Sequence, residues 1–235
     1  MNYDYMNMAF TGGNAKSEQA YLYIRDLIMH NELKAGQKVV EEEIAAKLVT
    51  SRTPVREALR RLSADGLVTI HPRSYAQVTV FSKDMICQMG YVRLALDVLS
   101  GQLAIYLGSD ADFKAISEQA DICNKAFTSG EIYSAIVADR NFHLAITAIS
   151  KNDILMRYNY ANYLRLHLMQ LQYSGLAEHG KRESFHDVVI DCLVRRDSAA
   201  LTAAITDRYS MIYGLEPKIV EPYKAALALK TGMQG

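Results

Sequence analysis

The sequence predicts a mainly α-helical fold with one small β-hairpin, and three observations lead to this prediction. Residues 17–64 carry three short helical patterns. Two β-branched runs, 67–70 and 76–81, flank the turn "HPRSY". From residue 83 to about 214 only helical periodicity remains. Because the pattern changes at "FSKD", we place a domain boundary at residues 81–84, and 235 residues suffice for two modest domains.

The N-terminal elements follow a recognisable order. The first predicted helix, 17–30, has apolar residues on one face, and the second, 41–49, has three glutamates in its first turn, where the helix dipole favours negative charge. We expect Thr53 to cap the third helix and Pro54 to be its first residue. Two short helices with a tight connection, the second rich in arginine, followed by a hairpin, are typical of a winged helix-turn-helix.

The third helix is the most basic stretch of a chain with no net charge, which has 26 basic and 26 acidic residues. A charge run is usually a solvated helix face, but the second helix of this motif enters the major groove of DNA. Thr53, Arg56 and Arg60 share one face, and we expect Arg52 to precede the helix and reach a phosphate or a guanine. Arg61 is four residues from Glu57 and is expected to pair with it in solvent.

Composition indicates the compartment. The cysteines Cys87, Cys123 and Cys192 are odd in number and form no CxxC pair, so we expect buried thiols in a reducing cytoplasm. The first sixteen residues lack the pattern of a secretory signal, and we expect them to form a flexible arm. No uncharged apolar run of 18 residues occurs, so we expect no membrane span.

The predicted helices of the C-terminal part carry polar residues on their apolar stripes. These helices cover 84–107, 110–128, 131–150, 153–174, 181–195 and 198–214. Buried charge is costly unless it is paired or bound to a metal, so such residues are candidates for an effector site. A lone one is commonly a satisfied core group, and Arg93 has Asp97 four residues on as an ion-pair partner. The candidates are Arg93, Asp139, His143, His167, His186 and Arg208, the last expected between Leu201, Ile205 and Ile212.

Two parts of the chain resemble a known family. "SRTPVREALRRLSADGLV", residues 51–68, is similar to the signature of the GntR family of bacterial transcription regulators. "ADRNFHLAITAISKNDIL" and "ESFHDVVIDCLVRRDSAAL" resemble the all-helical (FCD-like) ligand-binding domain of its FadR-type branch. The chain departs from the family in Ala35-Gly36, where Pro-Gly is usual, and in Tyr75, where the wing tip usually has glycine. His71 and Arg73 can still reach a backbone phosphate from this wing.

The resemblance implies a function and an organisation. It implies a cytoplasmic homodimer that binds a two-fold symmetric operator in double-stranded DNA, under the control of a small organic-acid or sugar-acid effector. The corresponding domains are an arm at 1–16, a DNA-binding domain at 17–81, a helical effector-binding and dimerisation domain at 84–214 and a tail at 215–235. Many relatives bind a divalent metal through an Asp and a His four apart and two later histidines. Asp139, His143 and His186 match the first three positions and Arg208 matches the last.

The arginine at the last position leaves two interpretations open. Three nitrogen and oxygen ligands can hold zinc, nickel or manganese. Alternatively, Arg208 binds the carboxylate of an effector directly. We also considered a metal-dependent hydrolase or lyase tethered to a DNA-binding module, and a DNA-binding protein without a ligand. Because the sequence has no serine nucleophile elbow, P-loop or dinucleotide fingerprint, we expect no catalytic residues and no enzyme.

Overall fold

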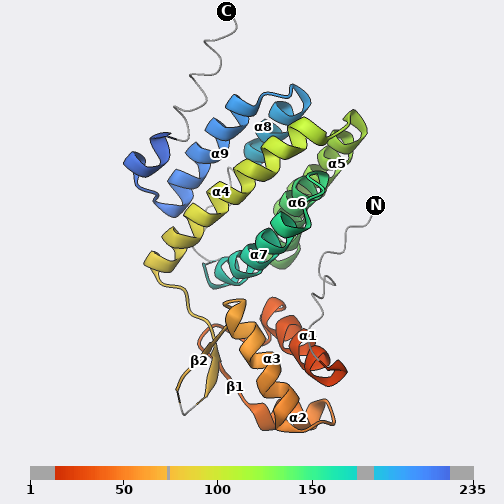
Figure 1. Ribbon diagram of the computed structural model, residues 1–235, viewed down its shortest axis with the longest axis vertical. Coiled ribbons are helices and arrows are strands. Elements are labelled where there is room, and N and C mark those ends of the chain that lie inside the picture. Colours follow the sequence, from red (N-terminus) through yellow and green to blue (C-terminus); the bar gives the residue numbers. More distant parts are fainter. Residues whose placement is uncertain (1–13, 73–74, 174–182, 223–235) are drawn as a thin grey trace, which may run out of the picture. The chain divides into compact units, whose positions relative to one another are not determined.

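The computed structural model describes residues 14–72, 75–173 and 183–222 (Figure 1). Within these ranges the chain forms two compact units. One unit contains residues 14–81 and 163–173, and the other contains residues 82–162 and 183–222. Most of the predicted arm and the end of the predicted tail lie outside the described residues.

The first unit contains three helices and a small sheet. The helices are α1 (Ala15–Met29), α2 (Glu41–Lys47) and α3 (Arg52–Ala64), and the strands are β1 (Lys38–Val39), β2 (Val68–Ile70) and β3 (Ala76–Val78). The strands are antiparallel in the order β1-β3-β2. The predicted hairpin is therefore present. The sequence did not predict β1, because a strand of two residues is too short to show alternation.

Helices α1 and α3 form the core of this unit. Ala20, Ile24 and Ile28 of α1 are fully buried, as are Val55, Ala58 and Leu62 of α3. Helix α1 begins two residues earlier than predicted, because the side chain of Asn14 accepts a 2.9 Å hydrogen bond from the backbone nitrogen of Ser17.

The predictions for the start of α3 and for the partner of Arg61 are wrong. Arg52 does not precede the helix, and Pro54 is not its first residue. The helix begins at Arg52 and its N-cap residue is Ser51, not Thr53. Pro54 is accommodated in the first turn, where the backbone N–H groups lack helical partners in any case. Arg61 pairs with Glu18 of α1 at 2.6 Å rather than with Glu57, and its guanidinium lies 4.4 Å from the ring centroid of Tyr21.

The end of α7 (Asp153–Tyr173) also belongs to the first unit. The Arg165 side chain donates hydrogen bonds of 2.7 and 3.0 Å to the carbonyl oxygens of Asp65 and Ala64, at the C-terminus of α3. A cation that donates to the last carbonyls of a helix satisfies groups that the helix leaves unpaired. Tyr173 donates to the carbonyl of Phe81 at 2.7 Å. The DNA-binding domain predicted at 17–81 therefore receives contacts from a segment about ninety positions later.

The second unit is helical throughout its described residues. Its elements are α4 (Lys83–Leu107), α5 (Asp110–Thr128), α6 (Ile132–Ile149), the first half of α7, α8 (Glu183–Val194) and α9 (Ser198–Tyr213). These helices begin and end within two residues of the predicted bounds. No helix of the described chain combines the length and the apolar run that crossing a membrane requires.

Two glycines let α9 approach α4 closely. A Cβ atom added to Gly90 would lie 2.4 Å from the Cβ of Tyr213, and one added to Gly101 would lie 2.4 Å from a methyl group of Leu201. Since real Cβ atoms do not tolerate such distances, the absence of a side chain at these positions allows the packing. This contact brings the tyrosines of α9 against the polar residues of α4.

Candidate functional site

The arginines of α3 that were predicted to contact DNA lie on its exposed side. Arg52, Thr53, Arg56 and Arg60 are exposed, whereas the apolar residues of the helix are buried. Two of them form ion pairs with the first turn of α2. Arg52 Nη1 is 2.8 Å from Glu42 Oε1, and Arg56 Nε is 2.7 Å from Glu41 Oε2. These pairs hold two guanidinium groups at the surface of the helix-turn-helix.

Two residues of the wing, His71 and Arg73, were predicted to contact DNA. Arg73 lies outside the described residues, but His71 is half-buried and its ring lies 4.6 Å from that of Tyr75. The ammonium of Lys38 lies 4.3 Å from the centroid of the Tyr75 ring. Sequence reasoning missed Lys38, because a single lysine in a strand of two residues has no distinctive pattern. Tyr75 thus brings a cation to the wing.

A buried polar cluster lies in the second unit, where helices α4, α6, α8 and α9 meet. Arg93 Nε lies 3.3 Å from Asp97 Oδ2, and Arg93 Nη2 lies 3.8 Å from Asp139 Oδ2. His186 Nε2 lies 3.2 Å from Asp139 Oδ1, and His143 Nε2 lies 3.9 Å from the same oxygen. The structure therefore brings together Arg93, Asp97, Asp139, His143 and His186. We refer to these five residues as the polar cluster.

Two tyrosines that the sequence analysis missed complete this arrangement. Tyr209 donates a hydrogen bond to Asp97, and Arg93 donates one of 2.6 Å to the hydroxyl of Tyr213. Burial raises the pKa values of both phenols, that of Tyr209 well above its ordinary value. Both hydroxyls therefore stay protonated at neutral pH. Their spacing of four residues on α9 was a usable signal, since it places both rings on one face.

The protonation states of the cluster follow from burial and neighbouring charge. Burial, together with the positive charge of Arg93, lowers the pKa of His143 to about 4, so the imidazole is neutral at pH 7. Burial opposes the ionisation of Asp139, but the hydrogen bond with His186 and the nearby cations outweigh it. They hold the pKa of Asp139 well below its ordinary value, so this carboxylate is charged.

Two predicted members of the effector site are not part of the polar cluster. His167 is buried in the first unit, where its Nε2 lies 3.1 Å from the carbonyl oxygen of Met29. Arg208 is only half-buried, with its guanidinium 5.7 Å from the centroid of the Phe185 ring. Ile212, expected on the same inward stripe, is 41% exposed. Leu201 and Ile205 are buried as predicted, but the inward face continues through Tyr209 and Tyr213, so the predicted stripe was wrong at Arg208 and Ile212.

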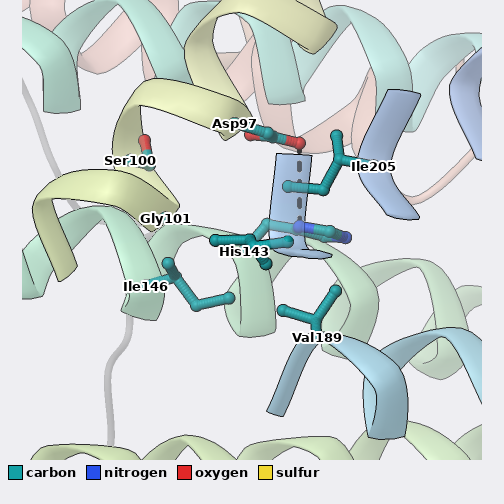
Figure 2. A pocket seen from close by; sticks show the side chains of 8 residues that line it. Asp97, Ser100, Gly101, His143, Ile146, Val189 and Ile205 are labelled. Atoms are coloured by element: carbon teal, nitrogen blue, oxygen red, sulfur yellow. Dashed lines mark ion pairs between the residues drawn. The ribbon is translucent and has the colours of Figure 1, made fainter. Parts of the chain in front are cut away.

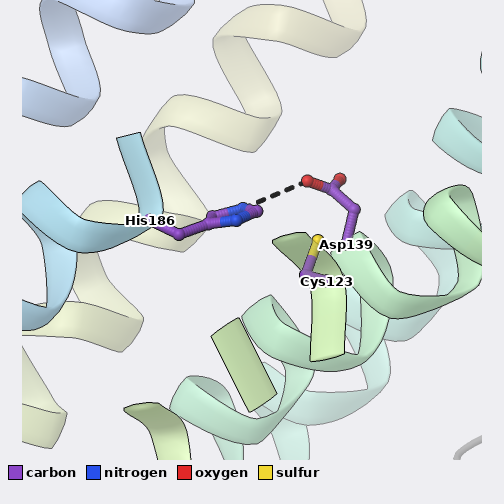
Figure 3. Close-up of side chains that lie close together, drawn as sticks. All are labelled: Cys123, Asp139 and His186. Carbon is purple, nitrogen blue, oxygen red and sulfur yellow. Dashed lines mark ion pairs between the residues drawn. The ribbon is translucent and has the colours of Figure 1, made fainter. Parts of the chain in front are cut away.

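Cys123 of α5 adds a potential metal ligand to the cluster. Ligand atoms of Cys123, Asp139 and His186 lie within 4.8 Å of one another, and all three residues are buried (Figure 3). Zinc bonds of 2.0–2.3 Å place tetrahedral ligands roughly 3.3–3.8 Å apart, so small rotations would close this set. Sequence reasoning missed Cys123 because a single cysteine on an apolar helix face is usually a core residue.

A small cavity lies beside the polar cluster. Its walls come from α4, α6, α8 and α9, and Figure 2 shows Asp97 and His143 facing each other across one side of it. His143 Nδ1 lies 3.7 Å from Asp97 Oδ2. The remaining lining residues are mostly apolar, among them Ile146, Val189 and Ile205. With a volume of about 10 Å³, the cavity has room for about one water molecule.

Comparison with known proteins identifies the class. A family model described as "Bacterial regulatory proteins, gntR family" matches residues 16–78, and the model of the FCD domain matches residues 88–210. The HTH-type transcriptional repressor RspR of Escherichia coli (strain K12) is 22% identical over 199 residues, which are 83% of this chain and 86% of that protein. The uncharacterized HTH-type transcriptional regulator YdhC of Bacillus subtilis (strain 168) is 25% identical over 57% of this chain and 60% of its own length.

Solved structures share the fold. E. coli McbR/YncC has a TM-score of 0.69 and 19% identity, and the match covers 92% of this chain and 99% of that one. A putative GntR regulator from Rhodococcus sp. RHA1 has a TM-score of 0.73 and 19% identity, covering 85% and 96%. A winged helix-turn-helix joined to an FCD effector-binding domain defines a DNA-binding transcription regulator. The chain belongs to the GntR family and has an FCD domain in its C-terminal unit.

Proposed function

We propose that this regulator binds its operator as a homodimer in the cytoplasm and that a small organic acid or sugar acid in the FCD domain changes its affinity for DNA. The observation that carries the proposal is the polar cluster. Three helices contribute its five charged or polar side chains, and α9 adds two tyrosine hydroxyls, in a buried place where a globular core would usually have apolar side chains. We assign no catalytic role to any residue.

The DNA contacts follow from the exposed face of α3. Arg52, Thr53, Arg56 and Arg60 would enter the major groove, and arginine offers a bidentate fork to guanine and to phosphate. His71 and Arg73 of the wing would contact the phosphate backbone. Lys38, held on the Tyr75 ring, adds a cation beside them. This assignment explains why a neutral chain has four arginines on one short helix.

The outer face of α4 supports a homodimer. Met85, Val92, Leu99 and Tyr106 are spaced seven residues apart, and they are 37%, 49%, 43% and 84% exposed. Apolar residues at heptad spacing form the seam by which two helices pack together. We name these four residues the α4 stripe. A second copy of the same helix presents an identical stripe, as a two-fold symmetric interface requires.

The effector would bind where Arg93 now contacts Tyr213. Arg93 is 5% exposed and is the cation of the polar cluster, so a carboxylate could replace the phenol hydroxyl as its partner. The neighbouring cavity, which Asp97 and His143 line, has room for only about one water molecule, so an effector at Arg93 would require Tyr213 and its helix to move. Arg208 precedes Tyr209 on α9 and would supply a second cation. A ligand that moves α9 gives the domain two states of different DNA affinity.

The buried donor set fits a divalent metal. His186 Nδ1 is buried and has no hydrogen-bond partner among the described residues. If the imidazole rotated, one ring nitrogen could bind a metal and the other could donate a hydrogen bond. Histidines that bind a metal are neutral, so Asp97 and Asp139 would then exceed Arg93 by one negative charge. A divalent ion with the Cys123 thiolate would make the cluster neutral. Asp139 and His186 would hold the ion with Cys123 or His143, and thiolate ligation favours zinc over manganese.

The metal would supply a fixed positive charge for an acidic effector. The residues of the chain would perform the other tasks. His143 is neutral at pH 7 and could bind a metal without releasing a proton. Asp139 is already ionised. Arg93 and Tyr213 would orient the carboxylate of the effector.

The test is a selection followed by a titration. Binding sites are selected from a random DNA library with the purified protein, and their affinity is measured against zinc, nickel, manganese and a panel of hydroxy acids and sugar acids. We expect at least one acid to raise the melting temperature and weaken DNA binding by about 5- to 150-fold. An acid that stabilises the protein but leaves DNA affinity unchanged would contradict the regulatory proposal.

A further inference from the structure

The pair formed by Arg52 and Glu42 lies on the surface proposed to meet DNA. Arg52 Nη1 is 2.8 Å from Glu42 Oε1, and both side chains are 55% exposed. One nitrogen of the guanidinium thus faces a carboxylate oxygen, while more than half of the Arg52 side chain stays exposed. The carboxylate itself also stays accessible to solvent. The two residues therefore present donors and an acceptor side by side on the same surface.

The neighbouring pair has a different character. Arg56 Nε contacts Glu41 Oε2 at 2.7 Å, but the Glu41 side chain is only 26% exposed. Because Glu41 is largely covered by the protein, we assign it the role of orienting Arg56 rather than of facing DNA. Glu42 is one residue further along α2 and twice as exposed, so a base edge can reach it. This difference separates the roles of the two glutamates.

The pattern of groups matches one base pair. In the major groove, a G·C pair presents the acceptors N7 and O6 of guanine and, beside them, the N4 amino donor of cytosine. Arginine donates to the two guanine acceptors, and glutamate accepts from the cytosine amino group. A paired Arg and Glu presents the complementary order of donors and acceptor. In addition, the ion pair fixes the guanidinium before binding, which lowers the entropy lost on contact.

We propose that Glu42 is a specificity-determining residue, which recognises the cytosine of a G·C base pair in each half-site while Arg52 recognises its guanine. The proposal rests on the placement of α3 in the major groove. Glu42 contributes little to overall affinity, because its charge also repels the DNA phosphates. Its effect is selectivity at one position of the operator.

The experiment uses full-length protein and an operator obtained by selection from a random library. At each G·C pair of a half-site, cytosine is replaced by 2-pyrimidinone, which lacks the 4-amino group. For the wild-type protein we expect one position where this change weakens binding by about 5- to 150-fold. With Glu42→Ala the same change should have no such effect, which is the coupling expected of two groups in contact. Selection with Glu42→Ala should relax the preference for G·C at that position.

Glu43→Gln is the matched control, since Glu43 is an exposed glutamate on the same helix. It should retain the wild-type response to 2-pyrimidinone. If Glu42→Ala binds all sequences more tightly with an unchanged base preference, Glu42 only repels phosphate and the proposal is overturned. If Arg52→Ala also leaves sequence preference unchanged, the placement of α3 in the groove is wrong as well. The two failures are therefore distinguishable.

Discussion

The hydroxyl of Tyr209 donates a 2.5 Å hydrogen bond to the carboxylate of Asp97. Both side chains are buried, and the bond connects α9 to α4 next to the cavity. Arg93 contacts the same carboxylate and also donates to Tyr213. The last helix of the FCD domain is thus bound to α4 through the groups that would contact an effector.

Replacing Tyr209 with Phe should lower the free energy of unfolding by about 2 kcal/mol. Hydrogen bonds to charged groups contribute about 1.5–3 kcal/mol, and the variant leaves a buried carboxylate with one partner fewer. Urea denaturation followed by circular dichroism measures the loss. Tyr158→Phe, at a position 66% exposed and outside the α4 stripe, is the control and should have no effect. An equal loss in both variants would argue against the buried bond as the cause.

The stability of the protein should depend on pH through His143. Its pKa is about 4 in the folded protein and about 6.5 in the unfolded chain, so the unfolded chain takes up a proton first as the pH falls. This contribution is fully present above pH 6.5 and decreases toward pH 4, by about 3 kcal/mol in all.

His143→Gln should remove this part of the pH dependence. Melting temperatures between pH 4.5 and 7 would show a flatter profile than that of the wild type. His30→Gln, which changes an exposed histidine of the other unit, should retain the wild-type slope. A His143→Gln profile as steep as the wild type would place the responsible group elsewhere.

Cobalt should report whether Cys123 binds a metal. Cobalt substitutes for zinc, and a thiolate ligand gives a charge-transfer band in the near ultraviolet. We expect this band in the wild type, its loss in Cys123→Ser, and its retention in Cys192→Ser, which changes another buried cysteine. Cobalt binding without the band would assign the ion to Asp139 and the histidines alone.

The α4 stripe can be tested by a single charge. Leu99→Asp places a carboxylate at the centre of the proposed dimer seam, where burial without a partner is costly. Sedimentation should show a monomer with an unchanged helical content. Val194→Asp, on an exposed position of α8 that is not in the stripe, should leave the dimer intact. A dimer that persists in Leu99→Asp would place the interface on another surface.

Substitutions at two arginines of α3 should affect DNA recognition and protein stability separately. Arg56→Ala should lose specific DNA binding without unfolding, since each base contact contributes about 1–3 kcal/mol and a symmetric dimer loses it twice. Arg61→Ala should instead lower stability by about 1–2 kcal/mol, because it loses the contacts with Glu18 and with the Tyr21 ring. Gel shift and thermal melting of the same samples measure both properties. Equal effects of the two variants on DNA affinity would contradict the assignment.

The sequence predicted those features of the fold that local sequence patterns determine. Helix α5 is an example, because Ser109 and Asp112 form a capping box that marks its start. The exposed arginines of α3 also lay where their spacing placed them. In α9, however, Ala203, Ala204, Met211 and Ile212 give every face some apolar character. The stripe was therefore ambiguous, and it was assigned to the face of Arg208 rather than that of Tyr209.

The sequence pattern could not predict contacts between residues that are far apart in the chain. Cys123 lies near Asp139 and His186 only because α5, α6 and α8 pack together. In the same way, His167 was placed on a stripe of its helix without any indication that this part of α7 packs in the first unit. Periodicity predicts which face of a helix is buried but not which helix packs against that face. The residues that make up the site could therefore be identified only from the fold.

The contacts of Arg165 and Tyr173 have a consequence for biosynthesis. They satisfy the carbonyl oxygens of Ala64, Asp65 and Phe81, and both residues come long after the sheet in the chain. While the ribosome is still translating the FCD domain, the winged helix-turn-helix lacks these partners. These hydrogen bonds can therefore form only after residue 173 has emerged, so a nascent regulator completes this set of contacts only when most of its sensory domain has been made.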